Sequence, residues 1–313
     1  MNRPEPQTAS AVLMIRPTAF HSNPQTAASN AFQREPDAVA NELEQQAAAV
    51  QFESLADTLR MAGVEVIIEQ DTVEPATPDS IFPNNWISLH ADGSVVLFPM
   101  MAPNRRTERR LDIVERLGTV HGFRVQRVLD LSAWEERDRF LEGTGSMILD
   151  RVLRVAYACL SPRTDIEVLE DFCQRTGFKA LPFQAVDADG VPIYHTNVMM
   201  ALGKGYVVIC DAAIANPDER HAVLERLRSS GREIVSISHP QMAAFAGNML
   251  ELINAEGERV LVMSRRAEAS LTDPQRAVLG AHTRLLTAAI DDIEDSAGGG
   301  VRCMLAEIFL PRR

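Results

Sequence analysis

A recurring junction between a helix and a strand constrains the fold of this chain more than any other feature. Four segments with helical periodicity end at a glycine, and a β-type run follows each one. Glycine is favoured just after a helix because it enters the left-handed backbone region without a Cβ penalty. The glycines are separated by 55, 59 and 54 residues, at Gly63, Gly118, Gly177 and Gly231. The strands expected after them are VEVIIE, TVHGFRV, FKALPF and REIVSIS.

Two apolar runs joined by a short turn lie between successive junctions, which is the pattern of a β-hairpin. The four turns are at residues 92–93, 150–151, 203–205 and 254–257. Each repeat therefore contains a helix, a strand, a loop and a hairpin, and a chain of this length accommodates roughly five repeats. A fifth helix is expected over residues 273–282, with Asp273 as the N-cap and Pro274 at the first helical position.

The two ends of the chain supply the strands of the fifth hairpin. Residues 11–16 form an expected strand with no strand before it, and residues 302–309 form one with no strand after it. Long internal periods are typical of solenoids and propellers, and pairing these two strands would close a ring. We predict one α/β domain over residues 1–313, a five-bladed, pseudo-symmetric α/β propeller closed by its N- and C-terminal strands. The alternative is a mixed α/β sandwich whose regular spacing is accidental.

The charge of the chain argues against two classes of partner. Its 31 basic and 43 acidic residues give a net charge of −12, whereas nucleic acids and anionic membranes attract basic patches. No uncharged apolar run reaches the roughly 18 residues of a membrane span. The polar start, MNRPEPQTAS, lacks the apolar stretch of a signal peptide. We expect a cytoplasmic protein that binds no nucleic acid and no membrane.

Cys303 is the cysteine with the strongest sign of reactivity. It follows three glycines in GGGVRCM and stands beside Arg302, and a nearby cation favours the thiolate form of a cysteine. The alternative is a buried structural cysteine, which is the interpretation we adopt for Cys159, Cys173 and Cys210. None of the four forms a CxxC pair, so neither a metal site nor a disulfide framework is expected.

Polar residues stand a few positions before the hairpin in every repeat. They are Asn84 and Asn85, Glu142, His195, Asn248 and Cys303. In a closed ring, equivalent positions converge on the axis, so the repeat itself predicts that these side chains meet. A thiol nucleophile usually works with a histidine, and His195 is the histidine that this placement brings to Cys303. The alternative is that each polar residue merely caps its strand.

These residues also carry a resemblance to a known superfamily. The motifs Asp-x-x-Phe, Glu-Gly, Ser-x-Arg-Thr, His and Gly-Gly-Gly-x-Arg-Cys-Met follow one another in this order. From MIRP at residues 14–17 to its C-terminal end, the chain resembles the guanidino-group-modifying superfamily, which includes arginine deiminases, dimethylarginine dimethylaminohydrolases and amidinotransferases. The resemblance implies a five-bladed α/β propeller, the pentein fold, with a cysteine nucleophile, a histidine and neither metal nor organic cofactor.

The resemblance assigns catalytic roles to three residues. Cys303 matches the nucleophile, and His195 matches the general acid and base. Glu142 matches the acidic residue of the Glu-Gly motif, which contacts the substrate or orients the histidine.

The resemblance also assigns residues that bind the substrate. Asp79, in PDSIF, matches an acid that binds substrate in the dimethylarginine hydrolases. Arg163, in LSPRTD, matches the arginine that holds the substrate α-carboxylate. Arg105 or Arg106, in APNRRTE, resembles a second arginine on the carboxylate side.

Departures from the superfamily pattern bear on the substrate. Relatives that bind a guanidinium carry acids where this chain has Asn84 and Asn85, and their His-x-Asp motif is here His195-Thr196-Asn197. Carboxylates suit a guanidinium cation, whereas an amide donates and accepts and suits a neutral ureido group. We expect these amides, together with Asn248, to bind the ureido group of citrulline. MIRP, FPNNW and HTNVMM likewise resemble the citrulline-utilisation hydrolase branch.

The expected reaction is hydrolysis of citrulline to ornithine, carbon dioxide and ammonia. The Cys303 thiolate would attack the ureido carbon, His195 would protonate the leaving nitrogen, and water would release the carbamoyl thioester. The polar loop at residues 18–31 would act as a lid. The alternatives are an arginine deiminase or dimethylarginine dimethylaminohydrolase, an amidinotransferase, and a binding module without enzyme activity. The expected partner is a small amino acid, and formation of a homo-oligomer stays open.

Overall fold

A computed structural model of the chain describes residues 5–30, 32–34 and 41–313. In this part of the chain, fifteen strands form five three-stranded units of one design. An antiparallel hairpin supplies two strands, and the third runs parallel to the second strand of the hairpin. The units are β3–β4–β5, β6–β7–β8, β9–β10–β11, β12–β13–β14 and β15–β1–β2. The mixed α/β fold predicted from the repeat is confirmed.

The strands follow one another along the chain with helices between the units. The strands are β1 Ala11–Arg16, β2 Glu65–Gln70, β3 Ile87–Leu89, β4 Ser94–Leu97, β5 Arg127–Asp130, β6 Ile148–Asp150, β7 Val155–Cys159, β8 Lys179–Phe183, β9 Met200–Leu202, β10 Tyr206–Ile209, β11 Glu233–Ser236, β12 Leu250–Ile253, β13 Arg259–Ser264, β14 Arg284–Ala288 and β15 Ala306–Ile308. The helices are α1 Asn41–Met61, α2 Leu111–Thr119, α3 Gly143–Ser146, α4 Ile166–Thr176, α5 Thr196–Met199, α6 Pro217–Ser229, α7 His239–Ala243, α8 Arg265–Ser270, α9 Asp273–His282 and α10 Asp291–Ala297.

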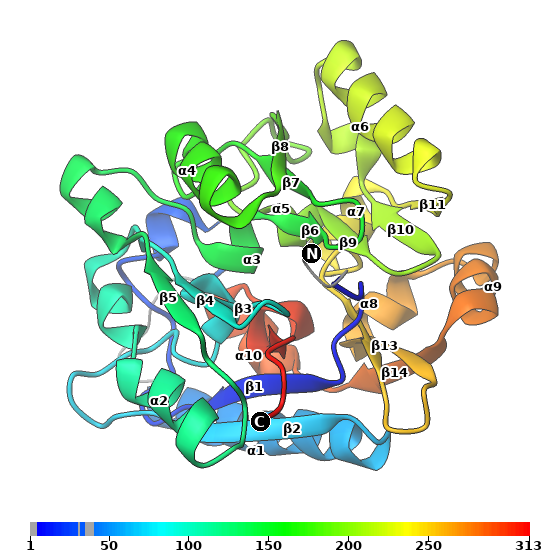
Figure 1. Cartoon of the computed structure of the whole chain (residues 1–313). Helices are drawn as coiled ribbons and strands as arrows, with labels where there is room; N and C mark the ends of the chain where they lie inside the picture. Colours follow the sequence, from blue (N-terminus) through cyan, green and yellow to red (C-terminus); the bar gives the residue numbers. More distant parts are fainter. Residues whose placement is uncertain (1–4, 31, 35–40) are drawn as a thin grey trace.

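The first and last strands pair with each other, as the sequence predicts. β1 and β15 are antiparallel, with Ala11 opposite Ile308 and Leu13 opposite Ala306. β15 also pairs with β3 in parallel, so two units share one six-stranded sheet. Figure 1 shows β1, in blue, beside the red C-terminal segment, with the other units following around the molecule in chain order. The two ends of the chain thus meet within one sheet.

Three of the four predicted helix-ending glycines adopt the left-handed conformation. Gly63, Gly177 and Gly231 have φ of +82°, +80° and +77°. Gly118 was predicted wrongly, because α2 continues through it to Thr119 and the left-handed residue is Gly122, with φ of +72°. A Cβ at position 118 would lie 3.1 Å from Nη2 of the C-terminal arginine. This glycine therefore permits a close approach of the chain end. The following strand, β5, begins only at residue 127.

Two further boundaries differ from the prediction. The N-cap of α9 is Thr272, not Asp273, and it forms a capping box with Gln275; Pro274 is the second residue of the helix. The last strand is shorter than residues 302–309, because Val301–Met304 form a 3₁₀ turn, η6, ahead of β15. The backbone N–H of Arg302 donates to Oδ1 of Asn248, and the backbone N–H of Cys303 donates to the carbonyl of Gly300. Neither group is free to pair in a sheet.

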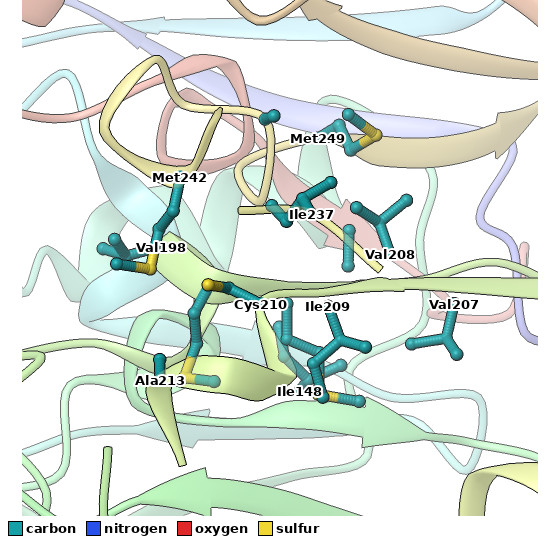
Figure 2. Packing of buried hydrophobic residues seen from close by; sticks show 14 of the residues in the cluster. Ile148, Val198, Val207, Val208, Ile209, Cys210, Ala213, Ile237, Met242 and Met249 are labelled. Atoms are coloured by element: carbon teal, nitrogen blue, oxygen red, sulfur yellow. The ribbon is translucent and has the colours of Figure 1, made fainter. Parts of the chain in front are cut away.

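The apolar core is divided among four clusters that lie between helices and sheets. Figure 2 shows part of one of them, where Val208 of β10 and Met249 just before β12 lie on one side of β10, and Ile209 of β10 and Ile148 of β6 lie on the other. This cluster therefore joins three of the units through buried side chains. No helix in the described ranges has the length and apolar character needed to cross a membrane.

A pair of glycine substitutions tests the backbone assignment. Gly177 caps α4 at φ +80°, so Gly177→Ala should destabilise the protein by about 1–2 kcal/mol, because a Cβ disfavours this conformation. Gly280 lies inside α9 with open space around it, so Gly280→Ala should stabilise by about 1 kcal/mol. Urea unfolding of both variants measures the changes, and a stabilising Gly177→Ala would contradict the assignment.

Candidate active site

The predicted catalytic residues lie where short turns enter the hairpins. Glu142 immediately precedes α3, which leads into β6, and His195 immediately precedes α5, which leads into β9. Asn85 lies in the 3₁₀ turn η2 (Pro83–Asn85) before β3, and Cys303 lies in η6 before β15. Asn248 stands just before β12. Equivalent places in successive units thus carry the polar residues.

A small cavity gathers six of the predicted residues. Its lining comprises Thr26, Asn30, Asp79, Phe82, Asn85, Arg105, Arg163, Tyr194, His195, Ala297, Gly298, Gly299 and Cys303. Four other predicted residues, Glu142, Asn84, Asn197 and Asn248, are buried outside this lining. A cavity with about 800 Å³ of empty space, beside Glu5 and Arg154, is lined by none of the predicted residues.

Glu142 holds His195 through a buried hydrogen bond. Nε2 of His195 lies 2.8 Å from Oε2 of Glu142, and the nearest nitrogens of Arg163 and Arg105 are 3.5 and 3.8 Å from the same oxygen. Burial alone would raise the pKa of Glu142, but Arg163 and His195 outweigh it and hold the pKa below its usual range. Glu142 is therefore ionised. Because it does not line the cavity, its contacts are those of a residue that orients the histidine.

His195 is neutral near pH 7. Burial lowers its pKa to about 4, although the hydrogen bond to Glu142 acts in the opposite direction. The ionised carboxylate accepts a hydrogen bond from the N–H at Nε2. The lone pair of the neutral ring is therefore on Nδ1. Nδ1 is thus the nitrogen that can take a proton from a neighbouring group.

Two side-chain amides lie at hydrogen-bonding distance from the thiol of Cys303. Nδ2 of Asn197 and Nδ2 of Asn248 each lie 3.3 Å from Sγ. Arg302 differs from the expectation, because its guanidinium donates to the Leu305 carbonyl and to Glu307 and lines another cavity. The amides, not this cation, are the donors at the sulfur.

The three remaining cysteines have the environment of structural residues. All three are buried, and none of them forms a disulfide. Burial raises the pKa of Cys159 and Cys173 to about 12 and that of Cys210 to about 11. These thiols stay protonated at neutral pH. No group of three or more His, Cys, Asp or Glu side chains in the described ranges is placed to hold a metal ion.

Arg105 lies in the cavity wall but its guanidinium is already engaged. It binds both oxygens of Glu108 at 2.9 Å, donates to Oδ1 of Asn85 at 2.9 Å and lies 3.6 Å from Asp79. Burial raises the pKa of Glu108 to about 7, against the opposing charge of Arg105. Arg106 lies outside the cavity lining, where it donates to two backbone carbonyls. Of the two arginines, only Arg105 is placed to meet a substrate.

The polar N-terminal loop covers the same cavity. Asn23 donates to Asp79 at 2.8 Å, and Arg163 donates to the Thr26 carbonyl at 3.2 Å and to Ser29 Oγ at 2.7 Å. Asn30 donates to the carbonyl of Ala297 at 2.9 Å. Residue 31 of the expected lid lies outside the described residues. The rest of the loop is tied to the residues expected to bind substrate.

Several residues of the site were missed by the sequence analysis. They are Asn23, Thr26, Ser29, Glu108, Gly145 and Tyr194. A Cβ on Gly145 would lie 2.4 Å from Nδ2 of Asn85 and 2.8 Å from Nδ1 of His195. The spacing Glu-Gly-x-Gly around Glu142 was the available signal for this close approach. No comparable spacing in the sequence indicated the residues that bind Arg105 and Arg163.

Acid should destabilise the protein through His195. Its pKa is about 4 in the folded protein and about 6.5 in an unfolded chain, so the unfolded state binds more protons between these values. The stability contributed is complete above about pH 6.5 and is lost as the pH falls toward 4. Between about pH 7.5 and 5, the free energy of unfolding, measured in urea, should fall by about 2 kcal/mol less in His195→Asn than in the wild type. His90, whose pKa burial also lowers, is present in both proteins. Equal losses would count against a neutral His195.

Comparisons with known proteins bear on the family and on the fold. Residues 16–310 match the family model described as N,N dimethylarginine dimethylhydrolase, eukaryotic. No curated protein matches the chain. Solved structures share the fold at low identity. The N-terminal domain of ArgZ, covalently bound to a reaction intermediate, is 18% identical with a TM-score of 0.74, over 96% of this chain and 99% of that one.

Two other solved structures extend the comparison. Unliganded AgrE is 18% identical with a TM-score of 0.75 over 97% of this chain, which spans only 40% of AgrE. An adduct of a dimethylarginine dimethylaminohydrolase variant with S-methyl-L-thiocitrulline is 15% identical with a TM-score of 0.65, over 96% of this chain and all of that one. Because the family model covers most of the chain, the protein belongs to the N,N-dimethylarginine dimethylhydrolase family, within the guanidino-group-modifying superfamily.

Proposed function

We propose that this protein hydrolyses citrulline to ornithine, carbon dioxide and ammonia through a covalent intermediate on Cys303. The observation that carries the proposal is the cavity itself, which brings together a cysteine, a neutral histidine and Asn85, while the amides of Asn197 and Asn248 reach the cysteine sulfur from behind the lining. Asp79 is the only carboxylate among the residues that line it. One carboxylate compensates the charge of a guanidinium cation less than several would, so this wall favours a cation over a neutral ureido group less strongly than an acid-rich wall does.

We also propose that the five units close into a propeller, with the active site on its axis. The antiparallel pairing of β1 with β15 and the parallel pairing of β15 with β3 support this arrangement. β9 contacts both β6 and β12, which supports the same order on the other side. Closure would explain why six separate segments of the chain line one cavity.

The first chemical step transfers the substrate to the enzyme. The thiol proton of Cys303 passes to Nδ1 of His195, and Sγ attacks the ureido carbon. The tetrahedral adduct then breaks a carbon–nitrogen bond, and the proton held on His195 goes to the departing nitrogen. An amine leaves, and a carbamoyl thioester remains on Cys303.

The second step consumes water. Neutral His195 takes a proton from water, and the hydroxide adds to the thioester carbon. Collapse of this adduct breaks the carbon–sulfur bond, and the proton on His195 returns to sulfur. The product carbamate decomposes to carbon dioxide and the second amine. Glu142 keeps the imidazole in one tautomer and stabilises its cationic form in both steps.

Arg163 and the N-terminal loop are the proposed holders of the amino-acid end. The guanidinium of Arg163 already faces two loop oxygens, from Thr26 and Ser29. A substrate carboxylate would replace these weaker acceptors with a charge-assisted, bidentate contact. The loop must then move, so it acts as a lid that admits the substrate and excludes water.

A second candidate function is hydrolysis of arginine or a methylarginine. One buried oxygen of Asp79, Oδ1, has no hydrogen-bond partner in the described structure, although Asp79 lines the cavity. Such an oxygen suits an N–H of a guanidinium as well as one of a ureido group. ArgZ is described as an arginine dihydrolase, and AgrE has been solved with L-arginine and with ornithine. A guanidino substrate is therefore the direct rival.

Product analysis separates these functions. Purified protein incubated with citrulline should release ornithine and ammonia, and Cys303→Ser should lower the rate by about 10³-fold or more, because the nucleophile is lost. Arginine, methylarginines and agmatine are assayed in parallel. Accumulation of citrulline from arginine would contradict the proposal, and dependence on an added amine would indicate amidino transfer. Activity that survives Cys303→Ser would exclude the site.

A single substitution tests the role of charge in substrate choice. Asn85→Asp places a carboxylate in the cavity wall while keeping the oxygen that accepts from Arg105. The added charge should lower kcat/KM for citrulline by about tenfold or more and raise it for arginine, because it opposes the ureido oxygen and favours a cation. Asn216→Asp, at the exposed N-cap of α6, serves as the matched control. Unchanged selectivity in Asn85→Asp would contradict the interpretation.

A further inference from the structure

The side chain of Asn248 makes three hydrogen bonds at the centre of the site. Its Nδ2 lies 3.3 Å from Sγ of Cys303 and 3.0 Å from the backbone carbonyl of Asn197. Its Oδ1 accepts the backbone N–H of Arg302 at 3.0 Å. The side chain is 2% exposed. It therefore links Cys303 to two neighbouring segments of the chain.

These partners determine which end of the amide faces the sulfur. A backbone N–H only donates and a backbone carbonyl only accepts. If the oxygen and nitrogen of Asn248 were exchanged, two donors would meet at Arg302 and two acceptors would meet at Asn197. The N–H groups must therefore point at Sγ and at the Asn197 carbonyl. Asn248 is a donor to the sulfur by necessity.

The surrounding backbone keeps Asn248 in this position. A Cβ on Gly300 would lie 2.5 Å from Oδ1 of Asn248, so only glycine allows this approach. The N–H of Asn248 donates at 2.8 Å to the carbonyl of Phe245, which has the left-handed φ of +63°. A non-glycine residue in this conformation costs energy and is retained where the fold requires it. The close approach of Gly300 and the bond to the Phe245 carbonyl both help to hold the amide of Asn248 in place.

Asn197 differs from Asn248 although it lies at the same distance from the sulfur. Its Nδ2 is 3.3 Å from Sγ, but its buried Oδ1 has no partner among the described residues. No neighbouring backbone group dictates its orientation, so this amide can either donate to a thiolate or accept from a thiol. Only Asn248 is obliged to donate.

We infer that Asn248 is a catalytic residue that donates a fixed hydrogen bond to Sγ of Cys303 and stabilises its thiolate. The inference rests on the proposed role of Cys303 as the nucleophile. When the thiol proton has moved to His195, the sulfur carries a negative charge. The hydrogen bond from a donor that is already in place then becomes stronger without any rearrangement. The amide thereby supplies the stabilisation that sequence reasoning assigned to Arg302.

Other titratable groups also face the sulfur or share its cavity. They are His195, Tyr194, Asp79, Arg163, Arg105 and Arg302. All of them remain in variants of Asn248, so a change in the pH profile of Asn248→Ala reports on the loss of the amide, whereas Asn248→Asp also adds the charge of its own carboxylate. This allows a test that needs no knowledge of the substrate.

The test is alkylation of Cys303 by iodoacetamide as a function of pH, with the labelled residue identified by mass spectrometry. Asn248→Asp keeps the oxygen that accepts from Arg302 and removes both N–H donors. The rate near neutral pH should fall about tenfold or more, and the midpoint of the profile should move upward by about one unit. Asn248→Ala removes the donor without adding a charge and should shift the midpoint in the same direction by less. Asn216→Asp is the matched control and should match the wild type.

Each outcome has a distinct meaning. A wild-type Cys303 that is not alkylated would overturn the proposed function. A reactive wild type, with both Asn248 variants showing the wild-type profile, would overturn only the role of the amide. A lower rate at every pH with an unchanged midpoint would make Asn248 a residue that positions the sulfur, and this would overturn the donor role. If Asn248→Asp does not fold, Asn248→Ala decides.

Discussion

The carboxylate of Glu142 is completely buried, and its contacts organise the rest of the site. Removing such a charge from water costs several kcal/mol unless partners of opposite charge and hydrogen bonds compensate. His195, Arg163, Arg105 and the N–H of Met101 supply that compensation. The tautomer of the imidazole therefore depends on this one ion, and the two guanidinium groups of the cavity wall compensate its charge.

Charges around the cavity are paired before any substrate enters. Arg105 is neutralised by Glu108, and Arg163 faces Glu142 and the oxygens of the N-terminal loop. Only Asp79 presents a carboxylate oxygen to the cavity without a partner among the described residues. Discrimination between a cation and a neutral ureido group then rests on a small difference in local charge. This is why amides in the wall carry more information about substrate than the acidic surface does.

The repeat was predictable because its signals are local. Turn residues, apolar runs and helix-ending glycines act within a few positions, so the hairpins and most helices appear where the sequence places them. The start of β15 was misassigned for the opposite reason, whereas at Gly118 the helix α2 continues to Thr119. The turn at Cys303 is held by Asn248, which is more than fifty positions away in the chain. Contacts of that range leave no mark in a local pattern.

By itself, the sequence determined the α/β repeat, the pairing of the two terminal strands and the set of chemical groups available: a thiol, an imidazole, a buried acid and several amides. These follow from residue type and spacing, which are properties of the chain. Only the tertiary structure decided the direction in which each group points. Arg302 turns away from the thiol toward Glu307, Asn248 takes its place at the sulfur, and Arg105 is bound by Glu108. Buried polar groups take the partners that leave the fewest of them unsatisfied, and those partners exist only once distant segments have packed together.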